Sequence, residues 1–487
     1  MTKIFRVTRA ELLKQISKVG TWIIVGVIGL YCLLSGGVSL LSSLFLNDFD
    51  SFQQEIEYID EQLEMSQQDW MIDEMDFATQ AEKDMYIKEQ EEYRAGLKER
   101  RANYQWLLDR EIAPGDWRAM ALLDEPGQMM MDGPIAAGLI DEAGIKTVIE
   151  KQDWAQYMDL LIRLAEMNEA AAGTSPTDGN RLSALLRLQL EKNLQASWAY
   201  GEVENILLQS NSIEMEKDSL ATMTNKTFSD RFYIRQAQES IRESEKQIQI
   251  SRYRLENNVA PVGDNDFFSF MMNFAGPSIL ILIVILLMTN SVCSEFSSGT
   301  IKILAITPYK RWKLLYGKFL AVIILAMGYM LIQYWLMSAV GLLFHGLPAG
   351  GQYVDIWGGR IVVLSPSAML GLHMANTFNV LLIVASFAMM IACLIRNGVW
   401  TTVITLGVYF LGNTVLGVLT ALPNPLALAG RFWLFANTNL LQYSSALGAA
   451  PRLTGMSLGF SLTTLTVYMI VFHFVSSLSV SRRPISA

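Results

Sequence analysis

The chain has 487 residues, of which 51% are apolar and only 17% are charged. Soluble domains are typically about 25% charged, so this composition excludes a single soluble globular domain, and it also excludes disorder. The segment from Asp48 to Asp264 holds 43 acidic and 22 basic residues, whereas the rest of the chain holds 4 acidic and 16 basic residues. We therefore expect a middle segment suited to water between flanking segments suited to a lipid bilayer.

Six long stretches without charge predict transmembrane helices. The first covers residues 22–46, and a helix of this length crosses the roughly 30 Å hydrocarbon core. It is less consistent with a cleaved signal peptide, whose apolar region spans only about 7–15 residues. The other charge-free windows lie between Asp266 and Glu295, Lys318 and Asp355, Arg360 and Arg396, Arg396 and Arg431, and Arg452 and Arg482.

The distribution of basic residues predicts the orientation, because Lys and Arg accumulate in cytoplasmic loops. Most basic residues outside the acidic segment lie in the N-terminal segment, the loop after the second span, the turn at Arg396 and the C-terminal tail. Six alternating spans place these four groups on one side. We therefore expect a protein of the cytoplasmic (cell) membrane with both termini in the cytoplasm and residues 47–265 outside.

These patterns predict an all-α polytopic membrane protein with a large helical domain between its first and second spans. Pro and Gly interrupt two regions of the later spans, which predicts an outer loop near 346–370 and a re-entrant or interfacial pair of short helices near 423–452. The expected parts are a cytoplasmic segment at 1–18, transmembrane helix 1 at 19–46, the extracellular domain at 47–265, transmembrane helix 2 at 266–294, a cytoplasmic loop at 295–318, transmembrane helices 3–6 within 319–480 and a cytoplasmic tail at 481–487.

Helical periodicity marks both ends of the extracellular domain. The first stretch has apolar residues at steps of three and four, namely Phe52, Ile56, Ile59, Leu63 and, further on, Trp70. The last has a seven-residue repeat typical of a coiled-coil seam, at Ile234, Ile241, Ile248 and Leu255. We expect these stretches to form an antiparallel stalk with further helices between them. The domain either binds a ligand, gates an exit or only caps the spans.

The residues offer no catalytic or cofactor chemistry. The middle segment has no Cys and no His, and the three His of the chain are scattered singly, which favours satisfied or interfacial histidines over metal ligands. No Asp, Glu, Lys or Arg lies well inside a span, which disfavours the alternative of an ion-coupled transporter. No phosphate-binding G-x-x-x-x-G-K-[ST] sequence occurs either, so the energy for any transport against a gradient would come from another protein. We expect no enzyme activity and no cofactor in this chain. Its acidic water-facing part also disfavours nucleic acid as a partner.

The loop after the second span is a candidate coupling element. Ser297, Ser298 or Thr300 can cap a short helix that Pro308 ends. An ordinary cytoplasmic loop is the alternative. The string EFSSGTIKILAITPYKRWKLLYGKFLA at residues 295–321 resembles the signature of ABC-2 type permeases, in which an acidic residue, Gly-Thr and a basic residue open a cytoplasmic helix before P-x-x-R-W. The matching positions are Glu295, Gly299, Thr300, Lys302, Pro308, Arg311, Trp312 and Lys318.

The resemblance, supported by the six spans and the long insertion, implies the permease subunit of an ATP-binding cassette exporter with a large extracellular domain. It implies a separate ATPase subunit that holds ATP and Mg, a second permease copy in a homo- or heterodimer, and surrounding membrane lipids. The ATPase-coupling loop would then consist of Glu295, Phe296, Gly299, Thr300, Ile301, Lys302, Leu304, Pro308, Arg311 and Trp312.

We expect Glu295 to pair with a basic residue of the ATPase, and Ile301 and Leu304 to pack into its groove. The resemblance does not identify the cargo. The alternative from another class is a membrane sensor or scaffold whose extracellular domain binds a peptide or a cell-envelope ligand.

Overall fold

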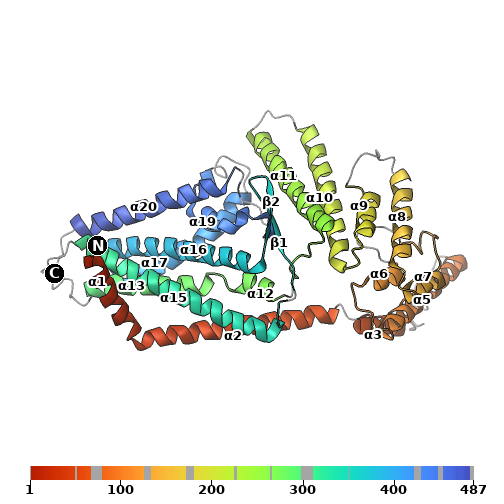
Figure 1. Ribbon diagram of the computed structural model, residues 1–487, viewed down its shortest axis with the longest axis horizontal. Coiled ribbons are helices and arrows are strands. Elements are labelled where there is room, and N and C mark those ends of the chain that lie inside the picture. The colour runs from red at the N-terminus through yellow and green to blue at the C-terminus, as the bar shows by residue number, and fades with distance from the viewer. Residues whose placement is uncertain are drawn as a thin grey trace. The chain divides into compact units, whose positions relative to one another are not determined.

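The structure is a computed structural model that describes residues 2–49, 52–66, 79–124, 133–171, 180–223, 228–263, 266–297, 311–348, 350–421, 429–447, 453 and 455–482. The chain divides into two compact units. The membrane unit consists of Met1–Ser39, Ile213–Lys246 and Pro261–Ala487, and the inserted unit consists of Leu40–Ser212 and Gln247–Ala260. Helices form nearly all the regular structure of both (Figure 1).

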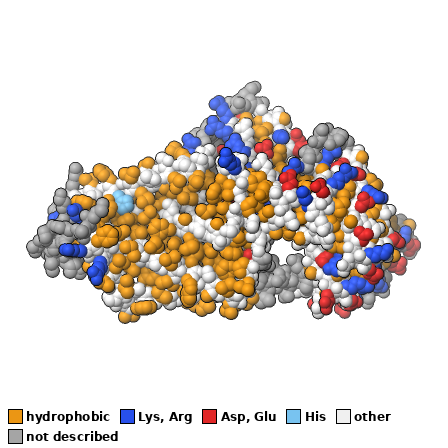
Figure 2. All heavy atoms as spheres, viewed as in Figure 1, with side chains coloured by type: hydrophobic (Ala, Val, Ile, Leu, Met, Phe, Trp, Pro, Cys, Tyr) orange, Lys and Arg blue, Asp and Glu red, His pale blue; other side chains and the backbone are white. Residues whose placement is uncertain are grey.

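Within the described residues, six helical segments are long and apolar enough to cross a membrane, which confirms the predicted all-α polytopic architecture. They are Val19–Leu41 in α2 (Val19–Phe49), Phe267–Ser294 in α12 and α13, Arg311–His345 as α15, Pro366–Ile395 as α16, Gly398–Val418 in α17 (Gly398–Ala421) and Leu458–Ser481 in α20 (Leu458–Arg482). Figure 2 shows hydrophobic side chains over much of the membrane unit, whereas acidic side chains gather on the inserted unit.

The second span is broken, where the sequence predicted one continuous helix. It consists of α12 (Phe267–Phe274) and α13 (Ser278–Ser297), separated by residues up to Pro277. Proline lacks an N–H group and disfavours helical geometry in the preceding residue. Neighbouring helices satisfy the released carbonyls: Gln333 Nε2 donates to the Gly276 oxygen at 3.0 Å, and the Tyr31 hydroxyl donates to the Phe274 oxygen at 3.1 Å. The break is therefore compatible with membrane depth.

The tight turn between α16 and α17 follows the sequence pattern. Arg396 ends α16 in the left-handed conformation with φ 59°, and the Asn397 side chain accepts from the Trp400 backbone N–H at the start of α17.

Within α17, a Cβ at Gly412 would lie 2.1 Å from the Phe435 ring, whereas nothing lies within 4 Å of the corresponding point at Gly407 or Gly417. Close approach therefore requires glycine at Gly412 only.

A β-hairpin occupies the region predicted as an outer loop. Strands β1 (Tyr353–Trp357) and β2 (Arg360–Leu364) pair antiparallel around Gly358 and Gly359, both with positive φ. Asp355 is completely buried and accepts hydrogen bonds from Trp357 Nε1, the Ser444 hydroxyl and the backbone of residues 356 and 445. It thus joins the hairpin to the segment between the short helices η1 (Leu440–Tyr443) and η2 (Ser445–Leu447), which follow α19 (Leu434–Asn437) in the chain. The rest of the predicted re-entrant region, 422–428 and 448–452, lies outside the described residues.

The inserted unit is a helical assembly with its own core. Its first helix, α3 (Phe52–Ser66), buries Phe52, Ile56 and Ile59 as its periodicity predicted, and Trp70 lies outside the described residues. The unit continues through α5 (Gln80–Leu108), α6 (Trp117–Leu123), α7 (Glu142–Glu150), α8 (Trp154–Ala171) and α9 (Leu182–Glu191) to α10 (Ser197–Thr222) and α11 (Phe228–Asn257), both of which it shares with the membrane unit.

The structure pairs the helices of the expected stalk differently. The predicted seam does lie on the more buried side of α11, where Ile248 and Leu255 are buried. Its partner in the inserted unit is α10, because Asn205 Nδ2 donates to the Ser251 hydroxyl and Arg254 pairs with Glu202 at 2.5 Å. Helix α3 instead packs along α5. Helices α3 and α11 therefore each pair with the helix next to them in the chain. Fewer residues lie between the paired helices, so the entropy cost of bringing them together is smaller.

Candidate functional site

The helices that flank the candidate coupling loop are described, but most of the loop is not. Glu295 and Phe296 lie in the last turn of α13, with side chains outside the described residues. Arg311 and Trp312 begin α15, so the third span starts before Lys318 and the expected loop is shorter. The predicted residues Gly299, Thr300, Ile301, Lys302, Leu304 and Pro308 lie outside the described residues.

Lys318 forms a buried polar junction beside this loop. Its side chain is only 3% exposed, and its Nζ lies 3.0 Å from Glu11 Oε1. The same Nζ donates to the Ser291 carbonyl oxygen at 2.9 Å. One ammonium group therefore links α1 (Thr2–Ile16), α13 and α15. A buried cation is costly unless it is paired and hydrogen-bonded, and here two different helices supply the partners.

Helix α1 packs closely on α15 at the same level. The Thr8 hydroxyl donates to the Gly317 carbonyl oxygen at 3.2 Å, and a Cβ at Gly317 would lie 2.6 Å from a methyl carbon of Val7. Glycine at this position thus allows the two helices to approach. Phe5 and Leu13 are more than half exposed on α1. The basic residues Arg6 and Arg9 of the same helix are also exposed. The helix consequently presents both apolar and basic groups away from α15.

Glu11 is not among the site residues that the sequence predicted, because the charge pattern of residues 1–18 indicates only a basic cytoplasmic segment. A signal was present: Glu11 is the only acidic residue before Asp48. An isolated acid within a basic amphipathic helix invites a search for a buried cation nearby. The match of Lys318 to the permease signature did not reveal its partner, since 307 residues separate the two along the chain.

The three histidines are hydrogen-bonded, as their isolation in the sequence predicted. His373 Nδ1 lies 2.6 Å from the Tyr334 hydroxyl, His345 Nε2 lies 3.1 Å from the Ser39 hydroxyl, and His473 Nε2 lies 3.3 Å from the Ser386 hydroxyl. The residues that the structure describes contain no group of three or more His, Cys, Asp or Glu that could hold a metal ion.

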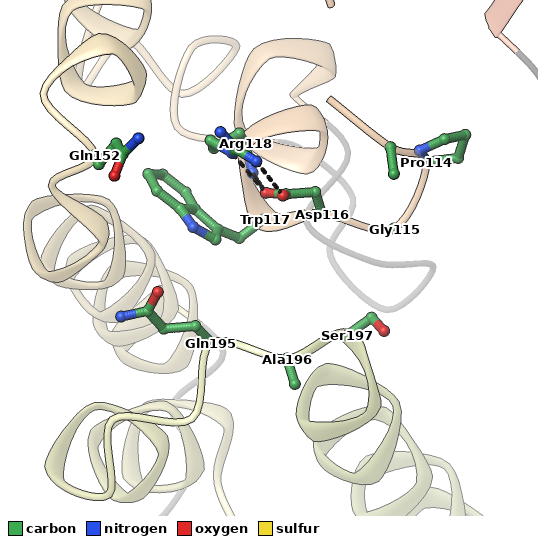
Figure 3. Close-up of a pocket in the computed structure, with 10 residues that line it drawn as sticks. Pro114, Gly115, Asp116, Trp117, Arg118, Gln152, Gln195, Ala196 and Ser197 are labelled. Carbon is green, nitrogen blue, oxygen red and sulfur yellow. Dashed lines mark hydrogen bonds and ion pairs between the residues drawn. The ribbon is translucent and has the colours of Figure 1, made fainter. Parts of the chain in front are cut away.

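The inserted unit carries an open pocket of about 750 Å³ where the turns before α6, α8 and α10 converge (Figure 3). Asp116 and Arg118 form a two-pronged ion pair on its wall, with N–O distances of 3.0 and 2.6 Å. Burial alone would raise the pKa of Asp116, but the side-chain and backbone hydrogen bonds of Arg118 outweigh it and lower the pKa. Gln152 and Gln195 add exposed amides. This lining suits a polar, uncharged ligand because its own charges are paired.

Comparisons with known proteins place the membrane-spanning part in a family. The family described as "Protein of unknown function (DUF2705)" matches residues 228–486, a range that contains the second to sixth spans. The chain is 29% identical over 238 residues to the uncharacterized protein YhcI of Bacillus subtilis (strain 168), an alignment covering 46% of this chain and 71% of that protein.

It is 26% identical over 213 residues to the uncharacterized membrane protein YdbK of the same organism, covering 44% of this chain and 80% of that protein. No solved structure matches the chain. Since the family match extends over more than half of the sequence, this multi-pass membrane protein belongs to the DUF2705 family.

Proposed function

We propose that this chain is the permease subunit of an ABC-2 type ATP-binding cassette transporter, that it exports its cargo, and that a separate ATPase subunit drives it. Two copies of the permease, identical or similar, would form the translocation path in the cell membrane, with both termini in the cytoplasm. ATP and Mg would bind to the ATPase. The observation that carries the proposal is the permease-like string at 295–321, which joins two spanning helices in a chain without a phosphate-binding sequence of its own.

The Lys318 junction would allow a movement of this loop to be transmitted to the spanning helices. The loop leaves α13 and enters α15, and Lys318 links both helices to α1 through bonds of 2.9 and 3.0 Å. A displacement of the loop would therefore move three helix ends together, because separating them would leave a buried charge without its partners. In the proposed cycle, ATP binding closes the two ATPase subunits and shifts the spans between two arrangements. Coupling between the ATPase and the spans requires two such arrangements.

Charge reversal at Glu295 tests the proposal. In the full chain co-expressed with a candidate ATP-binding cassette ATPase of the same organism, Glu295→Lys should lower the permease-stimulated ATPase activity and subunit co-purification at least tenfold, since a charge pair becomes a repulsion. Membrane insertion should not change. Glu256→Lys, on an exposed part of α11, is the matched control and should behave as the wild type. Normal coupled activity in the Glu295 variant would remove this residue from the mechanism.

The pocket of the inserted unit favours one second candidate, a sensor or scaffold that binds a peptide or a cell-envelope ligand. Its 750 Å³ lies within the range of small-molecule sites. Reconstitution separates the candidates. The transporter requires the ATPase and ATP for cargo movement in liposomes, whereas the sensor signals without cargo movement. Transport by this chain alone would contradict both.

A further inference from the structure

A groove of about 630 Å³ opens in the membrane unit near the start of α15. Three helices form it: α1 supplies Ile4, α20 supplies Ser477, and α15 supplies the remaining side chains, which are Trp312, Tyr316, Phe319 and Leu320. Apart from the Ser477 hydroxyl and the polar edges of two rings, the lining is hydrocarbon. Its volume is typical of sites that hold a ligand.

Aromatic packing fixes the wall of the groove. The rings of Trp312 and Tyr316 meet edge to face with centroids 6.0 Å apart. The Tyr316 ring stacks on the His473 ring with centroids 5.4 Å apart, and the Phe319 ring meets the His473 ring edge to face with centroids 4.8 Å apart. These four rings join α15 to α20 in one packed row. The wall is therefore preformed, which reduces the entropy lost when a ligand binds.

A cation lies at one end of the groove. Lys313 Nζ is 5.5 Å from the centroid of the Trp312 ring, and the exposed Arg311 precedes Trp312 in the first turn of α15. Positive charge is thus concentrated at the Trp312 end.

The polarity of the groove changes along α15 in the direction in which the helix enters the membrane. Trp312 and Leu320 are separated by about 12 Å along the helix axis, from a rise of about 1.5 Å per residue. No charged residue follows Lys318 in α15, so Phe319 and Leu320 enter the hydrocarbon core while Trp312 and Lys313 remain at the headgroup level. Tryptophan and basic residues are the usual side chains at that level.

We propose that this groove binds one anionic phospholipid, with its headgroup at Lys313 and Arg311 and an acyl chain along Tyr316, Phe319 and Leu320. Along the groove, basic residues are followed by aromatic residues and then by apolar residues. This order matches the charged headgroup, the interfacial region and the hydrocarbon chain of a phospholipid. Basic pockets at this membrane level favour anionic headgroups. A soluble peptide would bury its polar backbone against the apolar side chains of the groove without hydrogen-bond partners, which is unfavourable in free energy.

Native mass spectrometry of the full chain tests the headgroup and the acyl chain separately. The chain is exchanged into vesicles with equal phosphatidylglycerol and phosphatidylcholine, then released in mild detergent. The wild type should retain phosphatidylglycerol preferentially. Lys313→Glu should reduce that preference at least fivefold, since one basic residue contributes about that factor at an anionic surface. Ser477→Phe places a ring in the groove and should reduce retention of both lipids.

Matched controls keep these outcomes specific. Trp335→Ala removes a 71% exposed tryptophan from the same helix outside the groove, and Arg360→Glu reverses an exposed charge on the β-hairpin. Both should retain lipid as the wild type does. Unchanged phosphatidylglycerol preference in the Lys313 variant, or unchanged retention in the Ser477 variant, overturns the proposal. So does a pattern in which both variants keep the lipid but lose a co-purifying protein, because the groove would then be a protein contact.

A measurement on the wild type covers the case in which a variant fails to fold. A photoreactive phosphatidylglycerol with its reactive group in the acyl chain should cross-link to the peptide containing Tyr316–Leu320, and excess unlabelled phosphatidylglycerol should suppress the product. Labelling spread evenly over the exposed faces of α17 and α20, without such competition, would identify only bulk lipid and contradict the site.

Discussion

The membrane unit and the inserted unit treat charge in opposite ways. In the membrane unit, two buried charges each have several partners: Lys318 bonds to two helices, and Asp355 accepts from four donors. In the inserted unit, charges are numerous and many pairs are exposed, such as Lys88–Glu92, at 77% and 70% exposure. Its Arg254–Glu202 pair, at 12% and 9%, resembles the membrane unit's arrangement.

This difference shows that burial, and not only the distance between the charges, determines how much an ion pair contributes to the free energy of folding. Exposed pairs contribute about 0–1 kcal/mol because water and salt screen them. Breaking a buried pair costs about 3–5 kcal/mol because one charge is left without compensation. The numerous charges of the inserted unit therefore provide mainly solubility, while the few in the membrane unit determine which helices stay together.

The largest effect is expected from Lys318→Met. The change leaves Glu11 with Lys14 at 3.9 Å, a lysine that is 53% exposed, and should destabilise the chain by about 3 kcal/mol. Adding Glu11→Gln should recover most of that loss, because the uncompensated charge is removed. Thermal unfolding of the full chain in detergent, followed by tryptophan fluorescence, measures both. Lys88→Met should cost less than about 0.5 kcal/mol, and an equal loss in both single variants would refute the comparison.

A somewhat smaller effect is expected from Asp355→Ala in the β-hairpin. It leaves buried donors unsatisfied, at about 1–3 kcal/mol for the set after local relaxation. Trypsin should then cleave after Arg360 several-fold faster, because the hairpin loses its attachment to the segment at 444–445. Asp355→Asn keeps one acceptor oxygen and should give an intermediate rate. Cleavage of the alanine variant at the wild-type rate would show that the strand pairing alone holds the hairpin.

The smallest effect concerns Arg118→Met in the inserted unit. Asp116 has a lowered pKa in the folded protein, so its interaction with Arg118 stabilises the fold above the unfolded pKa near 3.9. That contribution disappears as the pH falls through the lower folded pKa. The variant should thus lose about 1 kcal/mol at pH 7 and less at pH 3, measured as the difference in melting temperature from wild type. A difference that grows on acidification would contradict this sign.

Much of the architecture could be predicted because it depends on local patterns. Charge-free windows located the six spans, and residue periodicity located α3. The hairpin was not predicted, although Gly358-Gly359 between stretches of alternating apolar and polar residues is a hairpin signal. The Pro and Gly residues that interrupt this apolar region favoured a loop instead. The break at Pro277 was also missed, since a single proline does not reveal whether a neighbour such as Gln333 will satisfy the freed carbonyl.

The candidate site was only partly predictable, because some of its residues come from parts of the chain that are far apart in sequence. The string at 295–321 marks the loop, and Trp312 with its basic neighbours marks a membrane boundary. Neither pattern contains Glu11, Ile4 or Ser477, which approach Lys318 and the groove from distant parts of the chain.

By itself the sequence determined that this protein spans a membrane six times and carries a large helical insertion, because transfer into lipid depends on the composition of each segment. Only the tertiary structure decided that Lys318 joins three helices, that Gln333 stabilises a broken span, and that three helix ends enclose an apolar groove. Such features depend on the close packing of residues far apart in sequence, which no local pattern specifies.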